Sequence, residues 1–169
     1  ICVYKYLLSK FKKSNHDFTL GIIGEDGLKY ELDNLKQLNN VKIEELPPKY
    51  NSKLFLVIGT VNDITIPVLE KAIKWVTAGA KIILTCKDMS DPSSKGDFSL
   101  GMPSHILHLI KYNLKTKSYP LGKPSPLVAN YIFKYYNDID PDEILFVGDT
   151  ILTDIRLAEE SGMRSLLVL

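Results

Sequence analysis

Apolar positions along the chain fall into two patterns that follow one another. Short, mostly apolar runs, typical of strands buried on both faces, occur at residues 18–23, 54–58, 81–86 and 144–147. Apolar residues three or four positions apart, typical of helices with one buried face, occur at residues 3–11, 27–38 and 66–78 and after Pro103 and Ser125. Because strands and helices alternate, we expect an α/β fold with a mostly parallel sheet.

The helix expected at 66–78 has sequence signals at both ends. Pro67 lies near its start, where a missing N–H costs nothing, and Gly79 lies just past its end. Its buried stripe is expected to consist of Leu69, Ala72, Ile73 and Val76. The strand at 81–86 follows at once, so this part of the chain is expected to form a βαβ unit.

The composition is that of an ordinary globular protein. The 169 residues are 45% hydrophobic and 24% charged, and the net charge of +1 gives no electrostatic argument for binding nucleic acid or a membrane surface. Cys2 and Cys86 are too few and too far apart in sequence to suggest a disulfide scaffold. No apolar run approaches the about 20 residues that span a bilayer. We therefore expect a cytoplasmic protein with reduced thiols.

The most informative chemical signal lies at the end of the strand expected at 144–147. Gly148 allows a sharp turn, and Asp149 then lies at the carboxyl edge of the sheet, where α/β proteins bind ligands. Asp154 follows near the first turn of a helix that runs to Ser161. Two such carboxylates can hold Mg²⁺, which accepts one or two of them and keeps its other positions for waters and a substrate phosphate. The alternative is an N-cap aspartate followed by a solvated carboxylate.

A lysine lies in a stiff turn before the preceding helix. Ser125 is expected to cap that helix and Pro126 to be its first residue. Lys123 therefore lies just before a helix N-terminus, where its ammonium group can neutralise phosphate oxygens or crowded carboxylates, as phosphoryl transfer requires. The alternative is an ordinary solvated loop lysine.

These motifs occur in a known order. Gly-Lys-Pro-Ser-Pro at 122–126, a helix, a strand and Gly-Asp-x-x-x-x-Asp-Ile at 148–155 resemble the third and fourth motifs of the haloacid-dehalogenase-like (HAD) phosphatases. The match is closest to the branch with para-nitrophenyl phosphatases, phosphoglycolate phosphatases and NagD-like enzymes. Residues 24–28 resemble the segment leading into the large cap of that branch, and residues 56–86 resemble the first βαβ unit of the cap.

The resemblance implies an α/β fold made of part of a Rossmann-like HAD core, with a parallel sheet, and an inserted α/β cap of the C2 type. It assigns residues 1–45 to a partial core, residues 46–118 to the cap, and residues 119–169 to the core with the lysine and metal motifs. The stiff polar connection Leu46-Pro47-Pro48-Lys49-Tyr50-Asn51 lies at the first of these boundaries.

The resemblance also implies a Mg²⁺-dependent phosphatase that acts on a small phosphorylated metabolite. Asp149 would bind Mg²⁺ directly, Asp154 would act through water, and Lys123 would balance the charge of carboxylates and phosphate. The cap would close over the phosphate and exclude water.

The cap strand departs from the family at one position. Where the family usually has Thr-Asn-x-Asp, this chain has Thr-Cys-Lys-Asp at 85–88, so only Asp88 carries over. Lys87 and Asp88 are the candidate substrate-binding residues. The irregular stretch at 88–101 is expected to contact the leaving group.

Phosphatases of this family attack phosphorus with an aspartate in an Asp-x-Asp-Gly motif, and the chain contains no such motif. Residues 138–141 have the carboxylate spacing, but Pro141 replaces the glycine, and we expect a turn with solvated acids. We therefore expect a C-terminal portion of a longer enzyme, inactive alone, with the aspartyl-phosphate formed on an aspartate outside this chain. The alternative is a non-catalytic fragment or degenerate member that serves as a binding or self-association module. A homo-oligomer formed through the cap is the one protein partner considered.

Overall fold

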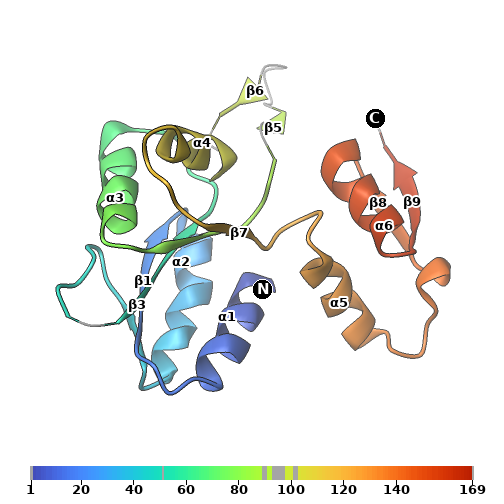
Figure 1. The fold of residues 1–169 in the computed structure, drawn as a ribbon. Coiled ribbons are helices and arrows are strands. Elements are labelled where there is room, and N and C mark those ends of the chain that lie inside the picture. The colour runs from blue at the N-terminus through green and yellow to red at the C-terminus, as the bar shows by residue number, and fades with distance from the viewer. Residues whose placement is uncertain (1, 51, 89–90, 93–97, 101–102, 169) are drawn as a thin grey trace. The chain divides into compact units, whose positions relative to one another are not determined.

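The chain folds into two compact units in a computed structural model, which describes residues 2–50, 52–88, 91–92, 98–100 and 103–168 (Figure 1). Unit 1 comprises Val3–Pro120, and unit 2 comprises Leu121–Leu169. Among the described helices, none has the length and apolar content needed to cross a membrane.

Unit 1 is built around a parallel sheet. Its helices are α1 (Cys2–Lys12), α2 (Asp26–Asp33), α3 (Ile66–Thr77) and α4 (Pro103–Asn113), with the 3₁₀ helix η1 (Asn34–Gln37). Its strands are β1 (Phe18–Ile23), β2 (Val41–Ile43), β3 (Lys53–Ile58), β4 (Lys81–Leu84), β5 (Asp91–Pro92), β6 (Phe98–Ser99) and β7 (Ser118–Pro120). Five strands pair in the order β2-β1-β3-β4-β7, and all four pairings are parallel. The predicted α/β fold with a parallel sheet is confirmed.

Helices cover both faces of this sheet, as its apolar strands predict. Figure 1 shows α1 and α2 on one side of the sheet and α3 on the other. On the α3 side, Trp75 is fully buried beside Gly21, where an added Cβ would lie 2.4 Å from the indole ring. On the α1 side, the Phe11 ring stacks on the Phe18 ring with their centroids 4.1 Å apart. Aromatic and aliphatic side chains on both faces therefore hold unit 1 together.

The order in which the chain adds strands to the sheet reverses between β1 and β3. From β1 the chain passes through α2 to β2 on one side, and from β3 it passes through α3 to β4 on the other side. Because crossovers between parallel strands are right-handed, α2 and α3 lie on opposite faces. The carboxyl ends of β1 and β3 are therefore the switch point of the sheet, where ligands of α/β proteins bind.

The buried stripe of α3 differs from the predicted one at one position. Ile73 is 44% exposed, whereas Trp75 is fully buried. These two residues lie on opposite borders of the stripe, so the helical spacing does not decide between them. The space beside Gly21 admits the indole ring, and Trp75 therefore turns toward the sheet.

Two parts of unit 1 differ from the boundaries expected from the sequence. Residues 1–45 contribute β1 and β2 to the same sheet as β3, so the structure has no division near residue 46, and the chain divides after Pro120, two residues from the second expected boundary. The stiff connection at residues 46–51 thus joins two strands of one sheet. The stretch at 88–101 contains β5 and β6, which pair antiparallel, while residues 89–90, 93–97 and 101–102 lie outside the described part.

Unit 2 is a smaller α/β unit. Its helices are α5 (Pro126–Tyr135) and α6 (Arg156–Glu160), with the 3₁₀ helix η2 (Pro141–Glu143) and the π-helical turn η3 (Ile151–Ile155). Its strands β8 (Leu145–Gly148) and β9 (Arg164–Leu167) pair in parallel. The core of the unit consists of Ala129, Leu157, Ala158 and Met163, with Phe146 of β8 packed against it.

The prediction that β8 is buried on both faces is wrong. Leu145 and Val147 are 55% and 52% exposed, and Leu166 and Val168 beside them are exposed as well. We call these four residues the open face of unit 2. An apolar run shows that a strand prefers burial but does not show which element covers it. Phe146 packs against the core that α5 and α6 help to form, so these helices cover one face of the β8–β9 pair.

Candidate active site

Lys123 lies in a turn that is tied to the start of α5. The Ser125 hydroxyl accepts a hydrogen bond from the backbone N–H of Leu127 at 3.4 Å, so Ser125 caps the helix as the sequence predicts. The backbone N–H of Ser125 donates to the Gly122 carbonyl at 2.8 Å and closes the turn. These two bonds fix the backbone on both sides of Lys123 and leave its ammonium group to reach another element.

The ammonium group of Lys123 binds Asp154. The Lys123 Nζ and Asp154 Oδ1 atoms are 2.5 Å apart, and the side chains are 38% and 4% exposed. The other carboxylate oxygen, Oδ2, accepts a hydrogen bond from the backbone N–H of Thr150 at 3.3 Å. A buried carboxylate is stable only when its charge is balanced and its oxygens are hydrogen-bonded, and both conditions hold here.

Gly148 is required by the position of Asp154. The π-helical turn η3 brings Asp154 back against the end of β8, where the Asp154 backbone N–H donates to the Thr150 carbonyl at 2.8 Å. An added Cβ on Gly148 would lie 2.2 Å from Asp154 Cβ and 2.4 Å from Cγ, far inside van der Waals contact. Only glycine at the end of this strand leaves room for the carboxylate.

Asp149 is the exposed member of the carboxylate pair. Its Oδ1 atom accepts a hydrogen bond from the Thr150 hydroxyl at 3.2 Å. Thr150 therefore contacts both carboxylates, through its hydroxyl to Asp149 and through its backbone N–H to Asp154. Thr150 is not among the site residues predicted from the sequence. Its position directly after Gly148-Asp149, at the start of the turn, is the sequence feature that could have identified it as a site residue.

Thr153 is a second residue near the site that is not predicted from the sequence. It is buried, and its hydroxyl has no hydrogen-bond partner in the described structure. Its neighbour Asp154 is buried beside it. A buried hydroxyl without a partner is costly, so Thr153 marks a place where unit 2 can accept one further polar contact.

The two carboxylates offer hard oxygen ligands, which suit Mg²⁺ better than softer metals. Among the described residues, no group of three or more His, Cys, Asp or Glu side chains could hold a metal ion. Mg²⁺ does not need such a group, because it is usually bound through one or two carboxylates and several waters. Both oxygens of Asp154 already accept hydrogen bonds, so Asp149 is the more available ligand. The donor set of unit 2 therefore fits Mg²⁺.

The remaining predicted site residues lie in unit 1, in the connection that follows β4 (Lys81–Leu84). Lys87 is exposed, and Asp88 is partly buried with one carboxylate oxygen, Oδ1, that has no hydrogen-bond partner among the described residues. The structure thus brings Lys123, Asp149 and Asp154 together in unit 2, whereas Lys87 and Asp88 belong to the other unit.

The chain is similar to known phosphatases along most of its length. Residues 120–169 match the family model described as HAD-hydrolase-like. The chain is 30% identical over 161 residues to the sugar-phosphatase AraL of Bacillus subtilis, and this match covers 94% of this chain and 56% of AraL. The solved 4-nitrophenylphosphatase from Thermotoga maritima is 26% identical with a TM-score of 0.77, covering 99% of this chain and 59% of that chain.

A more distant structure shows the fold alone. The p-nitrophenyl phosphatase from Archaeoglobus fulgidus is 22% identical with a TM-score of 0.74, over 99% of this chain and 59% of that chain. The chain thus spans little more than half the length of the relatives that it matches. The family-model match covers the segment that carries Lys123, Asp149 and Asp154. Residues 120–169 match the haloacid-dehalogenase-like hydrolase family, and in sequence and fold the whole chain is similar to p-nitrophenyl phosphatases and NagD-type proteins.

Proposed function

We propose that this chain is the lysine- and metal-binding part of a Mg²⁺-dependent phosphomonoester hydrolase that acts on a small phosphorylated metabolite. The observation that carries the proposal is the contact between Lys123 and the buried Asp154, beside the exposed Asp149. The pair balances the charge of the buried carboxylate and at the same time holds an ammonium group at a strand end that also carries the exposed Asp149. The matched relatives are named as sugar and nitrophenyl phosphatases, which supports the same reaction class.

The two aspartates have different proposed roles. Asp149 is exposed and accepts one hydrogen bond from a hydroxyl, so it would bind Mg²⁺ directly. Asp154 accepts hydrogen bonds from the Lys123 ammonium group and from the Thr150 backbone N–H. It would therefore hold Lys123 in place and contact Mg²⁺ through a water molecule. Mg²⁺, when bound, would supply positive charge that draws phosphate oxygens toward the carboxylates.

Lys123 would add to this neutralisation. Two unit charges of the same sign 4 Å apart repel by about 4 kcal/mol at an effective dielectric constant near 20, so a phosphate cannot approach the carboxylates unless their charge is balanced. The Asp154 contact orients the ammonium group before substrate arrives, and a group that is already oriented needs no reorganisation during the reaction. We expect Lys123 to contact the transferred phosphoryl group.

The nucleophile is proposed to lie outside this chain. The chain has no Asp-x-Asp-Gly motif, and it spans 59% of the Thermotoga maritima relative. An aspartate elsewhere would attack phosphorus, and water would hydrolyse the resulting aspartyl-phosphate. The chain alone is then inactive. Its cytoplasmic location, its homo-oligomerisation through the cap and the cap role of residues in unit 1 also stay predictions.

Lys87 and Asp88 are proposed to contact the leaving group. The support is the buried oxygen of Asp88 that has no hydrogen-bond partner among the described residues, and the exposure of Lys87 beside it. Replacing both with Ala in a full-length protein should change kcat/KM unequally between phosphate esters, because only contacts that differ between substrates discriminate them. A uniform loss over a panel of aliphatic and aromatic esters would instead mean that these residues support the fold.

The reaction is tested by comparing two proteins, the 169-residue chain and a version extended to the length of its relatives. Both are assayed with para-nitrophenyl phosphate, with Mg²⁺ and with EDTA. We expect turnover by the extended protein in Mg²⁺ only, and no turnover by the short chain. Mg²⁺-dependent turnover by the short chain would place the nucleophile within it, and inactivity of both proteins toward para-nitrophenyl phosphate would favour the non-catalytic alternative.

A further inference from the structure

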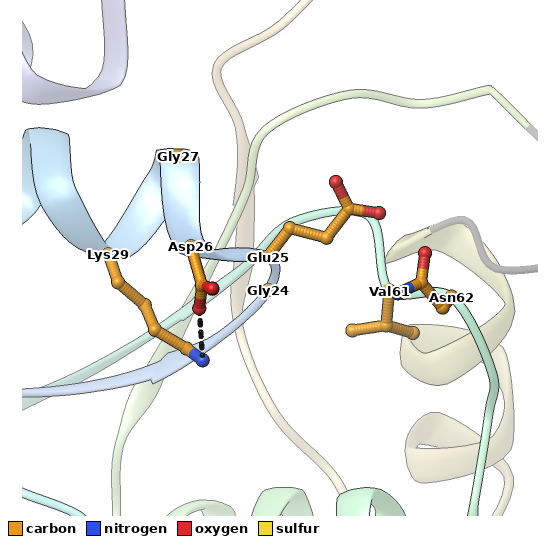
Figure 2. A pocket seen from close by; sticks show the side chains of 7 residues that line it. All are labelled: Gly24, Glu25, Asp26, Gly27, Lys29, Val61 and Asn62. Carbon is orange, nitrogen blue, oxygen red and sulfur yellow. Dashed lines mark hydrogen bonds and ion pairs between the residues drawn. The ribbon is translucent and has the colours of Figure 1, made fainter.

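A cavity lies at the switch point of the sheet in unit 1 (Figure 2). Its volume is about 460 Å³, within the range of roughly 300–1,000 Å³ that is typical of small-molecule sites. Residues 24–27 and Lys29, after β1, line one side, and Val61 and Asn62, after β3, line the other. The cavity therefore has the location that strand order predicts for a ligand site in an α/β protein.

The two connections that line this cavity are held together. The Glu25 backbone N–H donates to the Thr60 carbonyl at 3.2 Å, and the Gly59 N–H donates to the Ile23 carbonyl at 2.7 Å. An added Cβ on Gly24 or Gly59 would lie 2.7 or 2.6 Å from the same methyl group of Leu28, so glycines at both strand ends permit this close approach. The walls of the cavity are thus fixed relative to one another by the ends of two adjacent strands.

The side chains that line the cavity are mostly polar. The Glu25 carboxylate is exposed and forms no hydrogen bond or ion pair with any residue that the structure describes, and Figure 2 shows it reaching toward the side formed by Val61 and Asn62. The carboxylate of Asp26 instead binds Lys29 Nζ at 3.2 Å. Of the two acids, Glu25 is therefore the one available to a ligand.

The charges of this lining select the class of ligand. Two carboxylates and one ammonium group leave a net negative charge, which repels phosphate and other anions. Val61 is the only large apolar side chain among the lining residues, so an apolar ligand would find little to contact. A carboxylate accepts hydrogen bonds, an ammonium group donates them, and an amide such as that of Asn62 does both. Hydroxyl groups, which donate and accept, match all three.

We propose that this cavity binds an uncharged, hydroxyl-rich molecule of the sugar or polyol class, with Glu25 and Asn62 as its main contacts. Such a ligand has two sources, a free sugar or the alcohol part of a phosphate ester. The proposal does not depend on the phosphatase reaction, because binding of a free sugar is measured on this chain without turnover.

The test is a titration of the ¹⁵N-labelled chain with D-ribose, D-glucose and inorganic phosphate, followed by NMR. We expect both sugars to shift the amide signals of Gly24, Gly27 and Asn62 until saturation, and inorganic phosphate to leave them in place. Glu25→Ala and Asn62→Ala should each weaken sugar binding by roughly fivefold, the effect of one hydrogen bond. Glu70→Ala, which removes an exposed carboxylate from α3, is the matched control and should change nothing.

Titration with D-ribose 5-phosphate distinguishes the two sources. Binding no tighter than that of ribose identifies a free sugar as the ligand, and tighter binding that Glu25→Ala again weakens by roughly fivefold identifies the alcohol part of an ester. The proposal is overturned if neither sugar gives a saturable shift at these amides, if phosphate shifts them as strongly, or if the Glu70 variant loses as much affinity as the Glu25 variant.

Discussion

Replacing Gly148 with Ala should damage unit 2 and leave unit 1 intact. The new Cβ would lie 2.2 Å from Asp154 Cβ, so the buried carboxylate must move. Forcing a methyl group into a packed site costs about 1–3 kcal/mol. Displacing Asp154 also weakens its pair with Lys123, and because that lysine is 38% exposed we add only the value of an exposed pair, up to about 1 kcal/mol. The expected loss of stability is therefore about 1–4 kcal/mol.

Amide hydrogen exchange detected by mass spectrometry measures this loss in each unit separately. Peptides from residues 144–168 of the Gly148→Ala variant should lose protection, and a tenfold loss corresponds to about 1.4 kcal/mol. Trp75, the single tryptophan of the chain, reports unit 1 by fluorescence and should not change. Gly27→Ala is the matched control, because nothing lies within 4 Å of an added Cβ there. Equal protection in the two variants would refute the steric role of Gly148.

Three further predictions concern charged groups. Titration of the chain with MgCl₂, followed by NMR, should show that Asp149→Asn abolishes the shifts near β8 while Asp154→Asn weakens them; equal effects would contradict the proposed roles. Lys123→Ala in a full-length protein should lower kcat/KM for all phosphate esters alike, because every ester presents the same phosphoryl group, and a selective loss would speak against phosphate contact. The hydrogen bond and charge of Lys71 lower the pKa of Glu45, so Lys71→Ala should raise that pKa in an NMR pH titration. A lowered carboxyl pKa stabilises the fold at pH values above the ordinary pKa of glutamate. The small contribution of the Lys71–Glu45 pair should therefore fade as the pH falls from that ordinary pKa through the lowered pKa of Glu45.

The elements with clear periodicity could be predicted from the sequence, and the short ones could not. The strand at 18–23 is a clear apolar run, the helix near 66–78 has enough residues to show its period, and the structure contains both as β1 and α3. β2 and β7 have three residues each, too few to establish an alternation. The boundary expected near residue 46 rested on local stiffness, and the pairing of β1 with β3 across that connection is a long-range contact that local composition does not encode.

In the site, too, locally encoded features could be predicted and features set by the tertiary structure could not. The turn before Lys123 was predictable because the Ser125 cap and Pro126 are local signals, and the structure contains that cap. The double contact of Thr150 was not, because it depends on the π-helical turn that returns Asp154 to the end of β8. The cavity beside Glu25 was also beyond prediction, since a switch point is a property of strand order and β2 was not foreseen.

The open face of unit 2 affects how the size of this chain in solution should be interpreted. Leu145, Val147, Leu166 and Val168 form an apolar patch on two adjacent strands, and surfaces of this kind promote self-association. Sedimentation of the isolated chain should therefore show mass that rises with concentration. A dimer found in that way can form through this patch, so evidence for assembly through unit 1 requires that the dimer persists in a variant with Val147 and Leu166 replaced by polar residues.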